Sequence, residues 1–210
     1  MNIKDLFLSF EKRRKFNQEI KEKISLKCME LISAGNEIFL GAGTTVSFLG
    51  EYLAQSEKHF MLKIWTNNLF ILNLWLKEYE GFFLENFVGV VSGEISRKNL
   101  SIVDIHFDFS RIDKVIVGSP CISARGLSSD DIHTVQQLEH VIKKAGEVII
   151  LADSSKLGRE CTYQTRSMRM IRIDIKKGKK YTLITNGSKE DLYGKTVKKL
   201  RESGMRVIQV

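Results

Sequence analysis

Short apolar runs alternate with amphipathic stretches along the whole chain. The runs predict strands over 38–40, 61–65, 87–91, 115–117, 149–151, 181–185 and 205–210. The stretches between them predict helices over 10–34, around 46–53 and 69–76, and over 100–109, 131–145 and 190–203. Strands that alternate with helices pair in parallel through right-handed crossovers. The pattern predicts one α/β domain with a mainly parallel sheet and helices on both faces.

The first predicted helix, 10–34, is the longest. One apolar stripe runs along it at spacing four, made of Phe16, Ile20, Ile24, Cys28 and Ile32. Gly35 and Asn36 are a plausible end for this helix. We expect 1–34 to form an N-terminal helix that packs on a domain made of residues 35–210.

Five polar loops share one position relative to the predicted strands. They follow strand ends directly, at 41–45, 66–68, 92–94, 118–119 and 153–156. If the strands are parallel, these loops lie along one edge of the sheet, where ligands of open α/β sheets bind. Polar loops are common in any protein, but their shared position favours a binding site.

The loop Gly41-Ala42-Gly43-Thr44-Thr45 stands between a strand and a helix. Backbone N–H groups at such a helix start bind phosphate or carboxylate, aided by the helix dipole. It is neither a Walker A loop nor a complete dinucleotide fingerprint. The alternative is a tight turn in which Thr44 or Thr45 caps the helix.

The stretch Ile149-Ile150-Leu151-Ala152-Asp153-Ser154-Ser155-Lys156 ends a buried strand with an acid, two hydroxyls and a cation. Lys156 is a candidate phosphate ligand, and Asp153 and Glu94 are candidate acceptors for sugar hydroxyls. The alternatives are a turn at Asp153, a surface ion pair for Lys156 and a solvated turn at Glu94. We find no grouping of His, Cys and acidic residues that predicts a metal site, and no cofactor motif.

The composition is that of a globular protein, with 43% hydrophobic and 28% charged residues. No apolar run approaches the roughly 18 residues of a membrane span, and the charged N-terminus does not resemble a secretory signal. Cys28, Cys121 and Cys161 are few and widely spaced, so we expect reduced thiols, no zinc site and a cytoplasmic protein.

The net charge of +8 comes from the last quarter of the chain. Between Lys156 and Arg206 there are 15 Lys and Arg against 5 Asp and Glu. Such a surplus suits an anionic ligand or nucleic acid. The lysines around Gly178, however, favour an exposed loop, because a charge cluster alone gives no groove or base-reading element.

Several motifs together resemble the C-terminal effector-binding domain of DeoR-type transcriptional regulators. They are EKRRKFNQEIKEKISLKCMELISAGNEIFLGAGTT, WTNNL, VSGEI, IDKVIVGS with a following GLS, VIILADSSKLG and GMRVIQV, in the expected order over nearly the whole chain. The resemblance implies a fold like that of ribose-5-phosphate isomerase and CoA transferases. It also implies a sensor of phosphorylated sugars, with 1–34 as the linker that follows a winged helix-turn-helix. That DNA-reading unit is not found in these 210 residues.

Some positions depart from the family pattern. Gly41-Ala42 replaces an Asp-Ser pair, Ser92 replaces a glycine, and Asn186 replaces an Asp. The resemblance implies ligand contacts at the positions that are kept: Gly43, Thr44, Thr45, Asn67, Gly93, Glu94, Gly118, Asp153 and Lys156. The phosphate end of the site therefore matches the family, and the end that selects the sugar differs.

Two functions from different classes follow from these features. The first is a sensing domain that binds a phosphorylated sugar without turnover, within a homo-oligomeric regulator. The second is an isomerase-like enzyme that uses Glu94 or Asp153 as a base near Lys156. The apolar stripe of the first helix and the cluster of Phe82, Phe83 and Phe87 predict the oligomer, unless both complete the monomer core.

Overall fold

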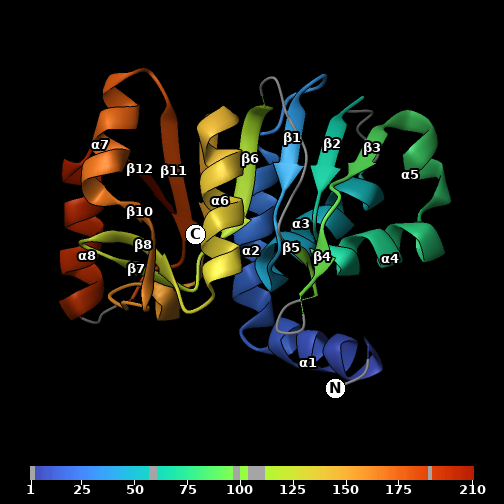
Figure 1. Cartoon of the computed structure of the whole chain (residues 1–210), viewed down its shortest axis with the longest axis horizontal. Coiled ribbons are helices and arrows are strands. Elements are labelled where there is room, and N and C mark those ends of the chain that lie inside the picture. The colour runs from blue at the N-terminus through green and yellow to red at the C-terminus, as the bar shows by residue number, and fades with distance from the viewer. Residues whose placement is uncertain (1–2, 57–60, 97–99, 104–111, 189–190) are drawn as a thin grey trace.

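The sheet at the centre of the molecule has seven strands in the order β12-β11-β9-β6-β1-β2-β3 (Figure 1). The computed structural model describes residues 3–56, 61–96, 100–103, 112–188 and 191–210. All the pairings within this sheet are parallel. The strands are β1 Glu37–Leu40, β2 Lys63–Thr66, β3 Phe87–Val90, β6 Ile112–Gly118, β9 Ala145–Leu151, β11 Lys180–Thr185 and β12 Arg206–Gln209.

Both faces of this sheet are covered by helices, so successive residues of one strand enter two different cores. In β1, Ile38 and Leu40 pack into one core and Phe39 into the other. The first core lies under α2 Gln18–Met29, α3 Thr44–Gln55, α4 Leu69–Glu78 and α5 Glu80–Glu85; the second lies under α6 Ile132–Lys144, α7 Met168–Lys176 and α8 Asp191–Glu202. Burial on both faces explains why the strands are continuous apolar runs. The predicted fold class is confirmed.

The prediction of one helix over 10–34 is wrong. The chain forms α1 Ile3–Lys15 and α2, separated at Asn17, whose φ of 53° is left-handed. Asparagine tolerates this conformation better than most residues. Phe16, assigned to the apolar stripe, is 64% exposed, whereas Ile24 and Cys28 are fully buried. The stripe of α2 therefore completes the monomer core.

Helix α1 lies across the end of the molecule where β1 and β2 terminate (Figure 1). Its residues Leu6 and Phe10 pack against Phe70 and Leu100, and the rings of Phe10 and Phe70 stack with centroids 4.9 Å apart. The turn at Asn17 directs α1 so that Leu6 and Phe10 are buried. A straight continuation of α2 would carry both side chains away from Phe70 and Leu100.

Two small antiparallel sheets were not predicted. One contains β7 Cys121–Ser123, β8 Gly126–Ser129 and β10 Tyr163–Ser167, and the other contains β4 Glu94–Ile95 and β5 Ile102–Val103. The predicted helix over 100–109 is wrong at 100–103, because Ile102 N–H donates to the carbonyl of Asn67 in an extended pairing. Residues 104–109 lie outside the described part of the chain.

Candidate functional site at the carboxyl edge of the sheet

The strand ends form one edge, as the sequence predicted. Leu40, the last residue of β1, is paired with Thr66 of β2 and Ile116 of β6, and Gly118 is paired with Leu151 of β9. The chain adds β2 and β3 on one side of β1, then continues with β6 on the other side. This reversal of strand order between β1 and β6 is where open α/β sheets bind ligands.

The glycine loop 41–43 lies at this reversal point. Gly41 N–H donates to the carbonyl of Ile116 at 2.9 Å, and a Cβ on Gly41 would stand 2.8 Å from Val117 Cγ1. Gly43 has φ +136°, and a Cβ there would be 3.9 Å from Gly118 Cα. The loop after β1 and the end of β6 are therefore in close contact, and the site residues Gly43 and Gly118 are brought together.

Helix α3 begins directly after this loop, with Gly43 as its N-cap and no side-chain cap. Thr44 and Thr45 are its first two residues, so the alternative that one of them caps the helix is wrong. Within the described residues, the backbone N–H groups of Thr44 and Thr45 have no acceptor. Free N–H groups at a helix start, with the dipole behind them, are suited to an anion.

Two asparagines follow β2. Asn68 caps α4 by accepting from Phe70 N–H and Ile71 N–H, and its amide donates to the carbonyls of Gly41 and Gly43 at 3.3 and 3.4 Å. Asn68 was not among the predicted site residues, although an Asn before an apolar helical run is a typical N-cap. It fixes the glycine loop against the start of α4.

Asn67 is 1% exposed, and its amide donates to the carbonyl of Ile102 at 3.1 Å. Its Oδ1 is the one buried side-chain oxygen or nitrogen without a hydrogen-bond partner in the described parts of the chain. A buried acceptor without a donor is unfavourable. A ligand hydroxyl is one group that would satisfy it.

The turn after β9 is a short 3-10 helix, η1 Ser154–Lys156. Asp153 is buried and accepts from Ser155 N–H at 3.0 Å, so it has the turn role considered for it. Asn186, at the end of β11, accepts from Ser154 N–H at 2.7 Å. Lys156 is half-buried and forms no ion pair with any described residue. Its ammonium is thus not neutralised as the surface-pair alternative required.

Lys21 of α2 is a further cation at this edge. Its side chain is buried, and its ammonium donates to the carbonyl of Arg13. Burial lowers the pKa of Lys21 to about 8; Asp153 acts in the opposite direction, and Lys156 adds to the lowering. Lys21 was not among the predicted site residues. Its signal in the sequence is a lysine between Ile20 and Ile24, on the buried face of α2.

Gly93 and Glu94 lie where the chain passes from β3 into the small sheet of β4 and β5. They follow β3, the edge strand, and both are exposed. Glu94 pairs with Val103 in the two-stranded ribbon β4–β5, and the neighbouring Ile102 is bonded to Asn67. Among the described contacts, none joins Gly93 or Glu94 directly to the glycine loop.

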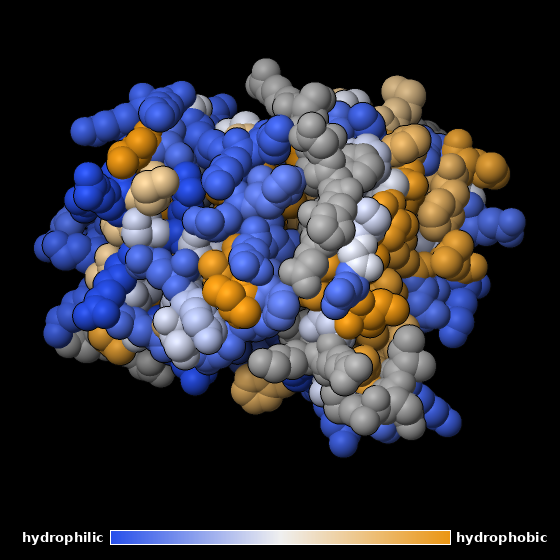
Figure 2. Space-filling model, viewed as in Figure 1, coloured by the Kyte–Doolittle hydropathy of each residue, from blue (hydrophilic) through white to orange (hydrophobic). Residues whose placement is uncertain are grey.

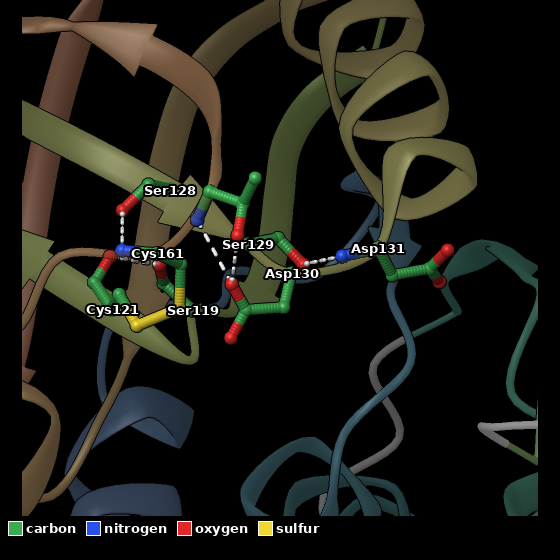
Figure 3. Close-up of a disulfide and its surroundings, with 8 residues drawn as sticks. Ser119, Cys121, Ser128, Ser129, Asp130, Asp131 and Cys161 are labelled. Atoms are coloured by element: carbon green, nitrogen blue, oxygen red, sulfur yellow. Dashed lines mark hydrogen bonds between the residues drawn. A yellow bond between two sulfur atoms is a disulfide. The ribbon is translucent and has the colours of Figure 1, made fainter.

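The prediction of three reduced thiols is wrong for two of them. Cys121, at the start of β7, forms a disulfide with Cys161, and the two Cα atoms are 5.8 Å apart (Figure 3). Cys161 N–H also donates to Ser128 Oγ at 3.0 Å. The segment after η1 folds back on the β7–β8 hairpin, which brings together cysteines 40 residues apart in sequence. Cys28 is a free, buried thiol.

The basic run near Gly178 is partly structural. Lys179 donates to the carbonyl of Ile142 at the end of α6, while Lys176, Lys177 and Lys180 are exposed. A lysine that binds a helix C-terminus is stabilising. The exposure of the other three lysines agrees with the interpretation of this run as an exposed loop. In the described residues, no three His, Cys, Asp or Glu side chains are grouped as metal ligands, and no helix has the length and apolar character needed to cross a membrane.

The fold and this edge define an α/β protein with a candidate anion site at the β1–β6 reversal. The model of the DeoR C-terminal sensor domain family matches residues 16–178, so the chain belongs to that family. The match confirms the resemblance seen in the sequence.

Among the proteins similar to the chain are two curated relatives and one solved structure. The glycerol-3-phosphate regulon repressor of Escherichia coli is 30% identical over 76% of this chain and 62% of its own length. The lactose phosphotransferase system repressor of Streptococcus mutans is 25% identical over 85% and 74%. Ribose 5-phosphate isomerase A of Methanocaldococcus jannaschii is 19% identical over 69% and 58%, with a TM-score of 0.47. Membership in this family makes the chain a sensor domain of the DeoR type.

Proposed function

We propose that this domain binds a phosphorylated sugar at the carboxyl edge of its sheet and does not turn it over. The observation that carries the proposal is the start of α3, where the N–H groups of Thr44 and Thr45 have no described acceptor beside Gly43 and Gly118. A phosphate would accept from these N–H groups. The two relatives named above are repressors of glycerol-3-phosphate and lactose systems, which agrees with such a ligand.

The remaining candidate residues would hold the rest of this ligand. Lys156 adds a point charge from the neighbouring turn, and the unpaired Oδ1 of Asn67 would accept from a hydroxyl. Asp153 would face the polyol from the same turn as Lys156. Gly93 and Glu94 would contribute only from the β4–β5 ribbon, so we assign them the outer end of the ligand.

Replacing Lys156 with alanine is expected to weaken the binding of phosphorylated compounds roughly ten- to a hundredfold. A lost charge-assisted hydrogen bond costs about 1.5–3 kcal/mol, and 1.4 kcal/mol is about tenfold in affinity. The measurement is calorimetry with inorganic phosphate, glycerol 3-phosphate, ribose 5-phosphate and glucose 6-phosphate, alongside unphosphorylated glycerol and glucose. Lys177→Ala, at an exposed position, is the matched control. Equal affinity for phosphorylated and unphosphorylated compounds would refute the proposal.

We also propose that the domain forms a homo-oligomer through the β3 edge. Leu84 is 88% exposed and Phe87 is 56% exposed, and apolar side chains gather on this part of the surface (Figure 2). Strand β3 pairs only with β2 in the described sheet, and open apolar edges tend to associate. Phe82, by contrast, is buried in the monomer.

Light scattering should therefore give a mass above the 24.1 kDa of one chain. Phe87→Glu is expected to shift the protein toward monomer, because a charge in an apolar interface is unfavourable. Met170→Glu, which adds the same charge at an exposed position of α7, should not change the mass. A wild-type mass of one chain across the micromolar range would contradict the proposal.

The relatives suggest the setting in which such a sensor works. The chain spans about three fifths of the length of the glycerol-3-phosphate regulon repressor it matches. We propose that the complete protein is a cytoplasmic transcriptional repressor. In this proposal, DNA is contacted by a winged helix-turn-helix outside the 210 residues, and the sensor reports the sugar phosphate to it.

A further inference from the structure

The ammonium of Lys21 is a buried charge with few partners. Its residue is 4% exposed, and the carbonyl of Arg13 is its one hydrogen-bond acceptor in the described parts of the chain. An ammonium has three N–H donors, so two remain available. A buried charge that is incompletely paired is unfavourable unless another group compensates it.

The position of Lys21 follows from its neighbour one turn along α2. Ser25 donates from its hydroxyl to the carbonyl of Thr45 at 2.8 Å, which joins α2 to the start of α3. Residues four apart lie on the same face of a helix, so Lys21 faces the same side as Ser25. Helix α2 also packs against β9 and β11, and Asp153 and Lys156, in the turn after β9, are among the charged groups that act on the Lys21 ammonium.

The charges around Lys21 leave a positive surplus. Asp153 is the acid that acts on it, while Lys156, Arg13 and Arg14 are the cations. Arg14 is paired with Glu51, and Asp153 already accepts from Ser155 N–H. Among the groups that act on Lys21, Asp153 is therefore the one carboxylate, and it is also bonded to Ser155 N–H. This arrangement would be stabilised by an anion.

We propose that Lys21 binds the phosphate of the ligand from α2, opposite Lys156 and next to the start of α3. The inference rests on the proposed function and adds a residue to the same site. Bound phosphate favours the charged form of a neighbouring lysine. Lys21 of the free protein, whose pKa is lowered to about 8, should therefore take up a proton when phosphate binds in more alkaline solution.

The experiment repeats the calorimetry on the intact chain with inorganic phosphate and the same three phosphorylated compounds. At about pH 7, Lys21→Met is expected to weaken binding about tenfold or more, the usual loss for one charge-assisted bond. Lys21→Arg keeps the charge and should retain most of the affinity. Lys23→Met, at an exposed position of the same helix, should have no effect. Thermal unfolding of each variant checks that it is folded.

A second measurement needs no variant. Above about pH 7 a phosphate monoester is already a dianion, so a further change in affinity reports the protein. Wild-type affinity for ribose 5-phosphate should fall between about pH 8 and pH 9.5, as Lys21 loses its proton in the free protein, and Lys21→Arg should remove this fall because arginine stays charged.

Three outcomes would overturn the assignment. Unchanged affinity in Lys21→Met, or a flat wild-type pH profile, would remove Lys21 from the site and leave the proposed function intact. Failure of the wild-type protein to bind any phosphorylated compound would overturn the proposed function, and the assignment of Lys21 with it.

Discussion

Replacing Asp174 with alanine is expected to destabilise the domain by about 3–5 kcal/mol, the usual cost of removing one partner of a buried ion pair. Asp174 Oδ2 accepts from Arg166 Nε and Nη2 at 3.0 and 2.6 Å, and from the hydroxyl of Tyr181 at 2.6 Å. All three residues are buried. The change would leave the guanidinium and the phenol without their common acceptor.

This network joins β10, α7 and β11, so its loss should be seen as lower stability of the whole domain. The pKa of Tyr181 is raised by burial and by its bond to Asp174, so the phenol stays protonated and remains a donor. Urea unfolding measures the change. Glu202→Gln is the control, because Glu202 pairs with Lys199 on the surface of α8 and exposed pairs contribute about 0–1 kcal/mol.

Replacing both Arg166 and Asp174 by apolar residues, with Tyr181→Phe, should recover much of the lost stability. Such replacements of buried ion pairs are often neutral or stabilising, because no buried charge is left unpaired. A single Asp174→Ala variant as stable as the wild type would show that the network contributes nothing.

The sequence predicted the main sheet well because its signals are local. Runs such as Ile149–Leu151 are buried on both faces, and polar loops follow them at the same edge. The small antiparallel sheet gave no such signal. Ser123, Ser128 and Ser129 are buried polar residues of short strands, without a clear alternation of apolar and polar positions. Ser123 and Ser129 accept from N–H groups two residues away, whereas Ser128 accepts from the distant Cys161 N–H.

The site was predictable only in part for the same reason. Gly43 and Gly118 could be placed at one edge, since parallel pairing brings strand ends together. The burial of Lys21 depends on the bend at Asn17, which turns α1 so that the carbonyl of Arg13 faces α2. The unpaired Oδ1 of Asn67 depends on the extended segment at Ile102. Neither can be derived from local periodicity.

The prediction of reduced thiols failed because the spacing of the cysteines in the sequence does not show that Cys121 and Cys161 are close in the fold. Cys121 and Cys161 are far apart in sequence, and no Cys-x-x-Cys pair suggested a bond. The contact is created by the segment after η1, where Gly158 N–H donates to the carbonyl of Ile122 at 2.7 Å and Thr162 N–H donates to Asp130 at 2.8 Å. These bonds hold the two cysteines together independently of the disulfide.

Reduction of the Cys121–Cys161 bond is expected to lower the free energy of unfolding by about 3–4 kcal/mol. A bond across 40 residues restricts the unfolded chain, and the loop-closure model gives about this value for that length. The folded state should persist, since the bonds at Gly158 and Thr162 do not depend on sulfur. Denaturant unfolding with and without a dithiol reductant measures the difference.

Cys121→Ser with Cys161→Ser is the matched variant for this measurement. Without reductant it should be less stable than the wild type by the same amount, and with reductant the two proteins should unfold nearly together. Cys28 should not contribute, because it is free and buried, and burial raises the pKa of its thiol. Three titratable thiols in protein purified without reductant and then unfolded would show that the bond does not form. The prediction of three reduced thiols, made from the sequence, would then be correct.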